Sequence, residues 1–211
     1  MIQVKAPLIG ISRHRLVADG AGVTSLVGLH GCPLRCRYCI NRRYLGTDAL
    51  VEWVSPQQLV DRLMVDNLYF LATGGGVTLG GGEPGLHSEF MAEFRKAAPE
   101  RWKITVETSL CVERRALERL LPVVDHYIID IKDMNAGIYH DYTGRDAADK
   151  VADNLRWLLG HEGMAGHITV RVPHIPGFNR EPDVERSIAV LREMGVENID
   201  EFHYVMPETA E

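Results

Sequence analysis

Cysteine is scarce in this 211-residue sequence, and three of its four cysteines, Cys32, Cys36 and Cys39, fall within eight residues. A disulfide framework is the pattern of small secreted domains, and so local a group in a chain without an export signal does not fit it. A metal site is therefore the better interpretation. The fourth cysteine, Cys111, is distant in sequence, and we expect a packed thiol there because free cysteine commonly behaves as a small hydrophobic residue.

Charge of one sign and long apolar runs are also missing. Lys and Arg number 23 against 29 Asp and Glu, and the net charge of −6 is spread along the chain, which argues against nucleic-acid and anionic-membrane partners. The segment MIQVKAPLIGISRHRLV lacks the features of an export signal, and no later run is long enough to span a bilayer. We expect a cytoplasmic monomer whose partner is a small molecule or another protein.

Short apolar segments alternate with helical patterns, which indicates an α/β fold with a parallel sheet and right-handed crossovers. Periodicity alone leaves a partial barrel and a doubly wound open sheet as alternatives, and both place active sites at the carboxyl ends of the strands. No repeat, linker or low-complexity segment divides the chain, so we expect a single domain over residues 1–211. The predicted strands are 24–30, 77–80, 104–107, 126–131, 168–172 and 202–205, and the predicted helices are 55–71, 88–97, 113–121, 146–159 and 181–194.

Unusual residues gather where the predicted strands end. The segment HGCPLRCRYCIN follows the first strand, GGGEPG follows the second, and Thr108 with Ser109 follows the third. Asp130 and Lys132 lie at the end of the fourth strand, and Arg171 lies in the fifth. Because the carboxyl ends of parallel strands meet at one rim, this distribution predicts an active-site mouth.

Three thiolates on one loop can ligate three irons of a cubane cluster, and the fourth iron is then open to a ligand other than cysteine. Two other interpretations of Cys32, Cys36 and Cys39 remain at this point. One is a zinc site with a histidine such as His30 as the fourth ligand, and the other is a set of buried structural thiols.

The loop CPLRCRYC together with GGEP resembles the radical S-adenosylmethionine superfamily. More narrowly, GVTLGGGEPGLHSEF, VETSL, YIIDIKDMN, YTG and VRVPHIPGFN are similar, in order, to the activating enzymes of glycyl radical enzymes, and the similarity covers nearly the whole chain. It implies a partial (β/α)6 barrel with a [4Fe-4S] cluster on Cys32, Cys36 and Cys39. It also implies anaerobic, reductive cleavage of S-adenosyl-L-methionine to a 5′-deoxyadenosyl radical, which abstracts hydrogen from a glycine of a partner enzyme.

The resemblance also assigns residues to the cosubstrate. Gly81, Gly82 and Glu83 would let the methionine amino group approach the backbone, and Tyr38 would lie near the adenine. Ordinary core packing is the alternative for Tyr38. The residues implied for the ribose and methionyl ends are Thr108, Asp130, Lys132 and Arg171, although Asp130 and Lys132 could also form a purely structural ion pair.

The sequence departs from the family pattern in several places. A monovalent cation site would map to Glu107, Thr108 and Asp130, but Glu107 stands where an aspartate is expected. The usual DGPG appears as DGAG at residues 19–22, and Ile40 replaces an expected histidine after Cys39. These changes bear on adenine packing and partner docking more than on the cluster.

Two other functions stay open. One is a radical enzyme for a small molecule, similar to carboxy-deazaguanine synthase, although that family lacks the IDIKDMN and VPHIPGFN segments. The other is a binding module that holds zinc or a cluster without turnover. The chain has no second group of clustered cysteines, so an external flavodoxin or ferredoxin is the expected electron donor.

Overall fold

The computed structural model describes residues 4–16 and 20–204, which build one eight-stranded sheet in the order β3-β1-β2-β4-β5-β6-β7-β8. Strand β2 and strands β4 to β8 are parallel, whereas β1 and β3 extend the sheet in antiparallel register. The strands are β1 (Ala6–Arg15), β2 (Thr24–Leu29), β3 (Glu52–Val54), β4 (Gly76–Gly81), β5 (Lys103–Thr108), β6 (His126–Asp130), β7 (Ile168–His174) and β8 (Asn198–His203).

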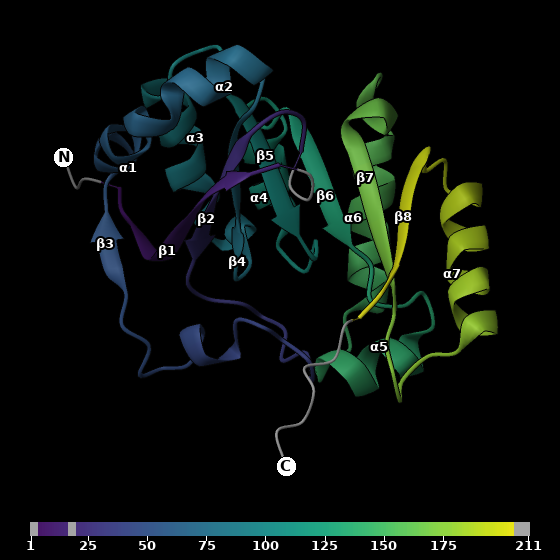
Figure 1. Cartoon of the computed structure of the whole chain (residues 1–211). Helices are drawn as coiled ribbons and strands as arrows, with labels where there is room; N and C mark the ends of the chain where they lie inside the picture. The colour runs from purple at the N-terminus through teal and green to yellow at the C-terminus, as the bar shows by residue number, and fades with distance from the viewer. Residues whose placement is uncertain (1–3, 17–19, 205–211) are drawn as a thin grey trace.

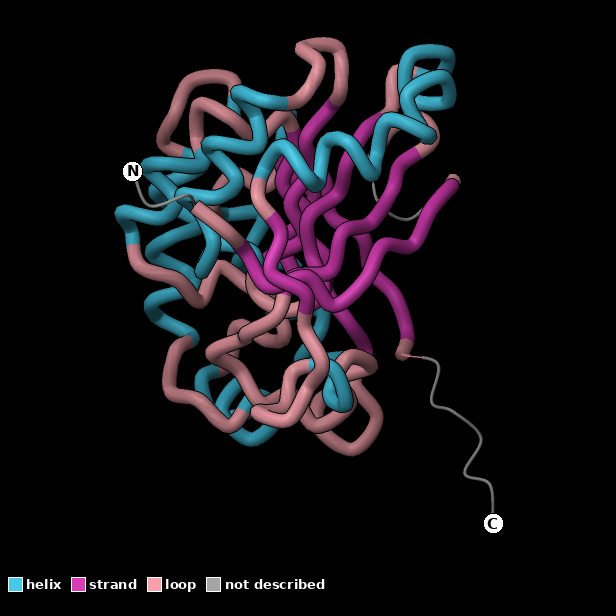
Figure 2. Tube along the Cα trace, turned by 90° about the vertical axis from the view of Figure 1, so that its left-hand side faces the viewer, coloured by secondary structure: helices cyan, strands magenta, loops and turns pink. Residues whose placement is uncertain are grey.

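The helices form an outer layer, in which α1 contacts α3, α3 contacts α4 and α4 contacts α6. Figure 1 shows this layer around the sheet, with the cluster loop and α5 on the side where the parallel strands end. The strands fan and curve without closing, as Figure 2 shows. The helices are α1 (Pro56–Leu63), α2 (Asn67–Thr73), α3 (Ser88–Ala97), α4 (Arg114–Leu120), α5 (Ala136–Thr143), α6 (Ala148–Leu159) and α7 (Glu181–Glu193).

The two faces of the sheet differ in chemistry because successive side chains of a strand point to opposite sides. Leu79, Val106 and Ile129 are fully buried in the core that the helices share. Their neighbours of the other parity, such as Glu107 and Arg171, line the open inner face. The predicted α/β fold with six parallel strands is therefore confirmed, and the curved, one-sided arrangement is that of the partial barrel.

The helix predicted over residues 55–71 is interrupted. It begins as expected, with Ser55 and Gln58 forming a capping box. A 3-10 turn, Met64–Asp66, then separates α1 from α2, and buried Asp66 accepts hydrogen bonds from Ser25 of β2 and Arg13 of β1. The turn thus brings a carboxylate to the sheet.

The last predicted strand was placed too late. Strand β8 begins at Asn198, four residues before the predicted start of 202, and Val205 lies outside the described residues. As an edge strand with mostly exposed side chains, β8 lacks the apolar run on which the prediction depended. Strands β1 and β3 and helix α5 were not predicted. Strand β1 contains Pro7 and Gly10, β3 has only three residues, and α5 has no apolar stripe at helical spacing. No described helix is long and apolar enough to cross a membrane.

Candidate active site

A cavity of about 780 Å³ opens at the carboxyl ends of the parallel strands, and we call it the carboxyl-end cavity. Its volume lies within the range of ligand pockets, roughly 300–1,000 Å³. The sequence analysis drew its site residues from separate segments, and the structure brings all of them to this one cavity. They are Cys32, Cys36, Cys39, Tyr38, Gly81, Gly82, Glu83, Thr108, Asp130, Lys132 and Arg171.

The loop that carries the three cysteines is held by backbone hydrogen bonds to the end of α5. The amide of Arg35 donates to the carbonyl of Thr143 at 2.8 Å, and that of Arg37 donates to Tyr142 at 3.0 Å. Arg145, just beyond α5, donates through Nε to the carbonyl of Pro33 at 2.8 Å. The YTG segment therefore positions the cluster loop.

The thiols of this loop are partly buried, and burial raises the pKa of Cys32 to about 12. Burial also raises the pKa of Cys36, although the nearby ammonium of Lys132 acts against it. Without metal both thiols therefore stay protonated at neutral pH. Binding of iron has to displace these protons, because the thiolate is the metal ligand.

The zinc alternative for the three loop cysteines and the packed-thiol prediction for Cys111 can both be compared with the structure. The Nε2 atom of His30 lies 3.1 Å from the carbonyl of Gly46, and His30 does not line the described cavity with the thiols. A zinc ion shared by His30 and the thiols does not fit this arrangement. Cys111 is 8% exposed within the hydrophobic core, as expected for a packed thiol.

Gly82 packs directly against the loop that leads to Cys32. A Cβ atom at this position would lie 2.2 Å from the carbonyl oxygen of Gly31 and 2.7 Å from that of Leu29. The amide of Gly82 donates to the carbonyl of Leu29 at 2.9 Å, and the amide of Glu83 donates to that of Gly31 at 2.7 Å. The sequence analysis attributed the glycine at position 82 to close approach of the cosubstrate. The structure shows that packing of the end of β4 against the cluster loop already requires glycine at this position. A larger residue would therefore displace the cluster loop as well.

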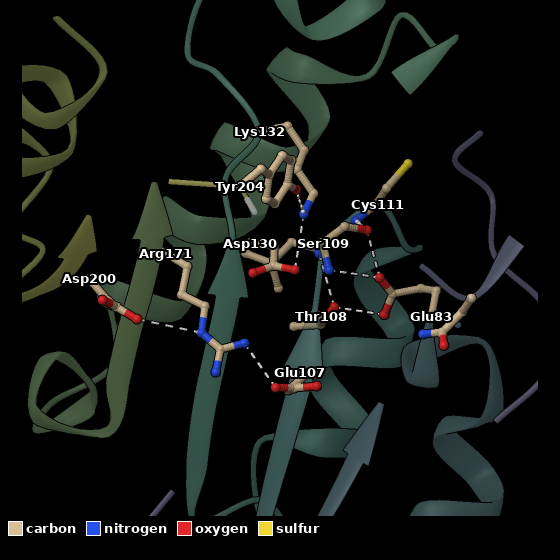
Figure 3. A network of polar contacts seen from close by, with 12 residues as sticks. Glu83, Glu107, Thr108, Ser109, Cys111, Asp130, Lys132, Arg171, Asp200 and Tyr204 are labelled. Atoms are coloured by element: carbon tan, nitrogen blue, oxygen red, sulfur yellow. Dashed lines mark hydrogen bonds and ion pairs between the residues drawn. The ribbon is translucent and has the colours of Figure 1, made fainter. Parts of the chain in front are cut away.

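The buried carboxylate of Glu83 ties the end of β4 to the end of β5 (Figure 3). Its Oε1 accepts from the Thr108 hydroxyl at 2.7 Å and the Gly85 amide at 3.1 Å. Its Oε2 accepts from the Ser109 amide at 2.9 Å and the Ser109 hydroxyl at 2.6 Å. Burial raises the pKa of Glu83, and these four donors oppose that shift. The sequence analysis noted Ser109 among the polar residues after this strand. It could not predict that Ser109 anchors Glu83, because no sequence motif marks that contact.

Lys132 lines the cavity and pairs there with Asp130 at 3.0 Å (Figure 3). Burial acts to lower the pKa of this lysine, but Asp130 together with Tyr204, Cys36 and Tyr142 outweighs burial, and the pKa stays well above its usual value. The hydroxyl of Tyr204 lies 3.3 Å from the same ammonium. Lys132 is therefore a fixed positive charge, suited to a carboxylate.

Aromatic rings cover one side of the cavity. Tyr38 meets Tyr142 at 6.1 Å and Phe178 at 5.6 Å between ring centroids, and Tyr142 meets Tyr204 at 6.1 Å. The Tyr38 hydroxyl donates to the carbonyl of Pro176 at 3.0 Å. Apolar ring faces next to polar groups suit a planar base. Tyr142, Phe178 and Tyr204 were missed by the sequence analysis because they come from segments far apart in the chain.

Below these groups Arg171 bridges two acids, Glu107 at 2.9 Å and Asp200 at 3.7 Å (Figure 3). Since Glu107 already binds a guanidinium, its predicted role as a cation ligand has no support in this arrangement. A cation site on Thr108 and Asp130 remains a prediction.

Three adjacent thiols, a fixed ammonium, an anchored strand end and an aromatic wall in one cavity fit an iron–sulfur cluster beside an adenosyl-sized ligand with a charged end. Comparison with known proteins agrees. The sequence profile of the Radical SAM superfamily matches residues 26–186. The protein is thus a radical SAM enzyme, which uses a [4Fe-4S] cluster and S-adenosyl-L-methionine.

Solved structures with the same fold include TYW1 with a lysine-pyruvate adduct and SuiB of Streptococcus suis. Their TM-scores are 0.60 and 0.62 at 15% and 12% identity, and they match 87% and 84% of this chain. The chain spans 65% of the TYW1 chain and 38% of the SuiB chain. At such identities the likeness shows the fold alone.

Proteins that are similar in sequence identify the family more narrowly than these structures do. The (2S)-3-sulfopropanediol dehydratase activating enzyme of Klebsiella oxytoca is 33% identical, with 85% of this chain and 75% of the relative covered. The pyruvate formate-lyase 1-activating enzyme of Escherichia coli K12 is 30% identical, with 88% and 76% covered. The isethionate sulfite-lyase activating enzyme of Desulfovibrio desulfuricans is 35% identical, with 83% and 74% covered. The chain belongs to this family of glycyl-radical-enzyme activating enzymes within the radical SAM superfamily.

Proposed function

We propose that this protein activates a glycyl radical enzyme by generating a radical on a glycine of that partner. The observation that carries the proposal is the convergence of every predicted site residue on one cavity at the open mouth of the barrel. The names of the relatives, all activating enzymes of other proteins, supply the substrate class. We further propose that residues 1–211 act as one domain.

In this proposal Cys32, Cys36 and Cys39 hold the cluster, which when bound supplies the electron that cleaves S-adenosyl-L-methionine to methionine and a 5′-deoxyadenosyl radical. Lys132 and the backbone at Gly82 bind the charged methionyl end. The ring of Tyr38 stacks near the adenine, and Glu83 positions Gly81 and Gly82. Thr108, Asp130 and Arg171 make further contacts with the ribose and methionyl ends of the cosubstrate.

The shape of the site allows the hydrogen atom to come from another protein. The sheet is open, because β3 and β8 are edges that do not pair with each other. An extended glycine loop of a partner can therefore enter the lumen, and by covering the mouth it would exclude water from the radical. Cleavage without the partner should accordingly be slow or uncoupled.

Electron paramagnetic resonance tests this proposal directly. The reduced holoenzyme, S-adenosyl-L-methionine and a candidate glycyl radical enzyme are mixed without oxygen, and we expect a doublet that disappears when the partner glycine is changed to alanine. Transfer of label from a small metabolite into 5′-deoxyadenosine, with no protein radical from any candidate, would instead favour a small-molecule radical enzyme of the carboxy-deazaguanine synthase kind.

The electron donor is proposed from charge. The segment HGCPLRCRYCINRRYLG contains four arginines and no acid, and Arg35, Arg37, Arg42 and Arg43 are exposed. In a chain of net charge −6 this basic surface beside the cysteines favours an acidic donor such as flavodoxin or ferredoxin.

Stopped-flow reduction of the holoenzyme by flavodoxin tests this surface. We expect the double change Arg35→Gln and Arg43→Gln to slow reduction and to weaken its dependence on salt, because steering by exposed charges is screened. Arg101→Gln is a matched control at the amino end of β5 and should reduce at the wild-type rate. An unchanged rate in the double variant would exclude this docking surface.

A further inference from the structure

A second group of metal-ligating side chains lies away from the carboxyl-end cavity, at the edge of the sheet where β7, β8 and α7 meet. His174 ends β7, Glu201 lies in β8, and Glu181 is the first residue of α7. One ligand atom from each of the three lies within 4.8 Å of the others. None of them lines the cavity that holds the cysteines.

We propose that His174, Glu181 and Glu201 bind a divalent transition-metal ion. The imidazole is 11% exposed in its side chain and both of its nitrogens face carboxylates, with Nε2 at 2.7 Å from Glu201 and Nδ1 at 3.6 Å from Glu181. A neutral imidazole has one N–H, so it can donate to only one of two carboxylates. A divalent metal ion bound to one nitrogen of His174 would balance the negative charge of both the Glu181 and the Glu201 carboxylates.

The backbone fixes most of this geometry. His174 is in register with His203 on the neighbouring strand, and Val172 is in register with Glu201. Glu201 and His203 are two residues apart, so they share one face of β8. The ring of His203 stacks on that of His174 at 4.0 Å between centroids, which holds the ligand ring in place.

Charge and access favour an ion as well. In the described part of the chain, His174 is the one ion-pair partner of both Glu181 and Glu201. The two carboxylates are 65% and 46% exposed in their side chains, so a hydrated ion can reach them and keep water in its remaining positions. A nitrogen and two carboxylates suit zinc, iron or manganese, whereas Mg²⁺ prefers oxygen ligands alone.

The proposed metal site lies at the two ends of the loop between β7 and α7, which contacts the cluster loop. The loop between β7 and α7 carries Pro176, whose carbonyl accepts the hydrogen bond from Tyr38 in the cluster loop. His174 and Glu181 flank this loop on either side. An ion bound between them would join the two ends of the loop and so hold Pro176 against Tyr38.

Manganese is the probe for a test, because it prefers nitrogen and oxygen ligands and competes poorly for the thiols of the cluster. Mn²⁺ is titrated into the anaerobic holoenzyme without cosubstrate, and the six-line resonance of free Mn²⁺ is followed. We expect one ion per chain. Glu201→Gln keeps an acceptor for His174 but loses the charged ligand, and it should bind about tenfold more weakly or worse, since even outer-shell changes typically cost 10–100-fold.

The matched control is Glu185→Gln, which removes the same charge from an exposed position on α7 and should bind as the wild type does. Iron content and melting temperature without manganese report whether Glu201→Gln folds normally. Addition of Mn²⁺ should then raise the melting temperature of the wild type and of Glu185→Gln only. Equal binding by wild type and Glu201→Gln, or no binding up to about 1 mM, the weakest class of biological metal sites, would overturn the proposal.

Discussion

Two cavities in the described part of the barrel have several polar side chains in their linings, and they differ in the chemistry that those side chains offer. The amino-end cavity, about 510 Å³, lies where the strands begin and shares Arg171 and Asp200 with the carboxyl-end cavity. Its polar groups bind one another, since Lys103 pairs with Asp125 at 3.3 Å and His126 contacts Thr169 at 3.0 Å. A polar lining by itself therefore does not make an active site.

The carboxyl-end cavity adds three thiols, which can ligate metal, beside backbone glycines and a buried ammonium. Its thiols lie on a loop after β2, its glycines lie at the end of β4, and its ammonium follows β6. The loops that follow parallel strands bring distant segments together at one rim, whereas polar residues at the strand starts pair with one another. If this contrast is correct, changes at the two ends must have very different effects.

The largest expected effect is loss of the cluster. Changing Cys36 to alanine removes one of three ligands, so the reconstituted protein should retain almost none of the roughly four irons of a cubane. Iron and sulfide analysis measures this, with Cys111→Ala as the control that keeps its cluster. A Cys36 variant with full iron content, or a colourless Cys111 variant, would mean that the ligands are assigned wrongly.

The next largest effect is expected at Glu83, whose carboxylate joins the ends of β4 and β5. Glu83→Gln places an amide NH₂ among four donors, so a buried donor loses its partner and the free energy of unfolding should fall by about 1–3 kcal/mol. Denaturant titration measures the change, and binding of S-adenosyl-L-methionine should weaken with it. Glu118→Gln, an exposed control on α4, should unfold as the wild type does. A Glu83 variant of unchanged stability would remove the anchoring role.

The protonation of Cys32 gives a pH-dependent effect. Because the folded, metal-free protein raises the pKa of Cys32 to about 12, only the small thiolate fraction reacts with iodoacetamide near neutral pH. The rate should then rise about tenfold per pH unit between about pH 7 and pH 9. Arg35 and Arg37 allow trypsin to separate the three cysteines for mass spectrometry. The unfolded protein should react faster, and a rate in the folded protein that levels off near pH 8.5 would contradict the burial of this thiol.

The smallest effect is expected at the amino end. Lys103→Gln removes an exposed ion pair with Asp125, and such pairs contribute at most about 1 kcal/mol. Iron content and cosubstrate cleavage should match those of the wild type. A cleavage rate that falls by more than about tenfold would show that the two cavities act together and that the contrast between them is too simple.

The sequence predicted the parts of the fold that local pattern determines. Helix α3 was predicted with its observed ends, and the parallel strands from β2 to β7 all lie within predicted segments or differ from them by a residue or two. The outer strands of the sheet were harder to predict, because β1, next to the edge, buries only its first three residues, and the edge strand β8 buries none fully. Pattern predicts buried elements better than edge strands for this physical reason.

The part of the site that could be predicted consists of rare residue types that lie close together in the sequence. Cys32, Cys36 and Cys39 stand out on their own, and the strand-end rule brought Lys132 and Arg171 to the same rim. The groups that hold this chemistry in place could not be predicted in the same way. Tyr142, Ser109 and Tyr204 act through contacts between distant segments, and those contacts exist only once the chain is folded.

The central claim is that the carboxyl-end cavity holds a cluster that cleaves S-adenosyl-L-methionine. The most direct measurement incubates the anaerobic, reconstituted protein with the cosubstrate and a strong reductant, and quantifies methionine and 5′-deoxyadenosine by chromatography. The account predicts both products in equal amounts, accumulating over hours without a partner, and neither product from the Cys36→Ala variant. A fully loaded and fully reduced cluster that yields no 5′-deoxyadenosine would contradict it.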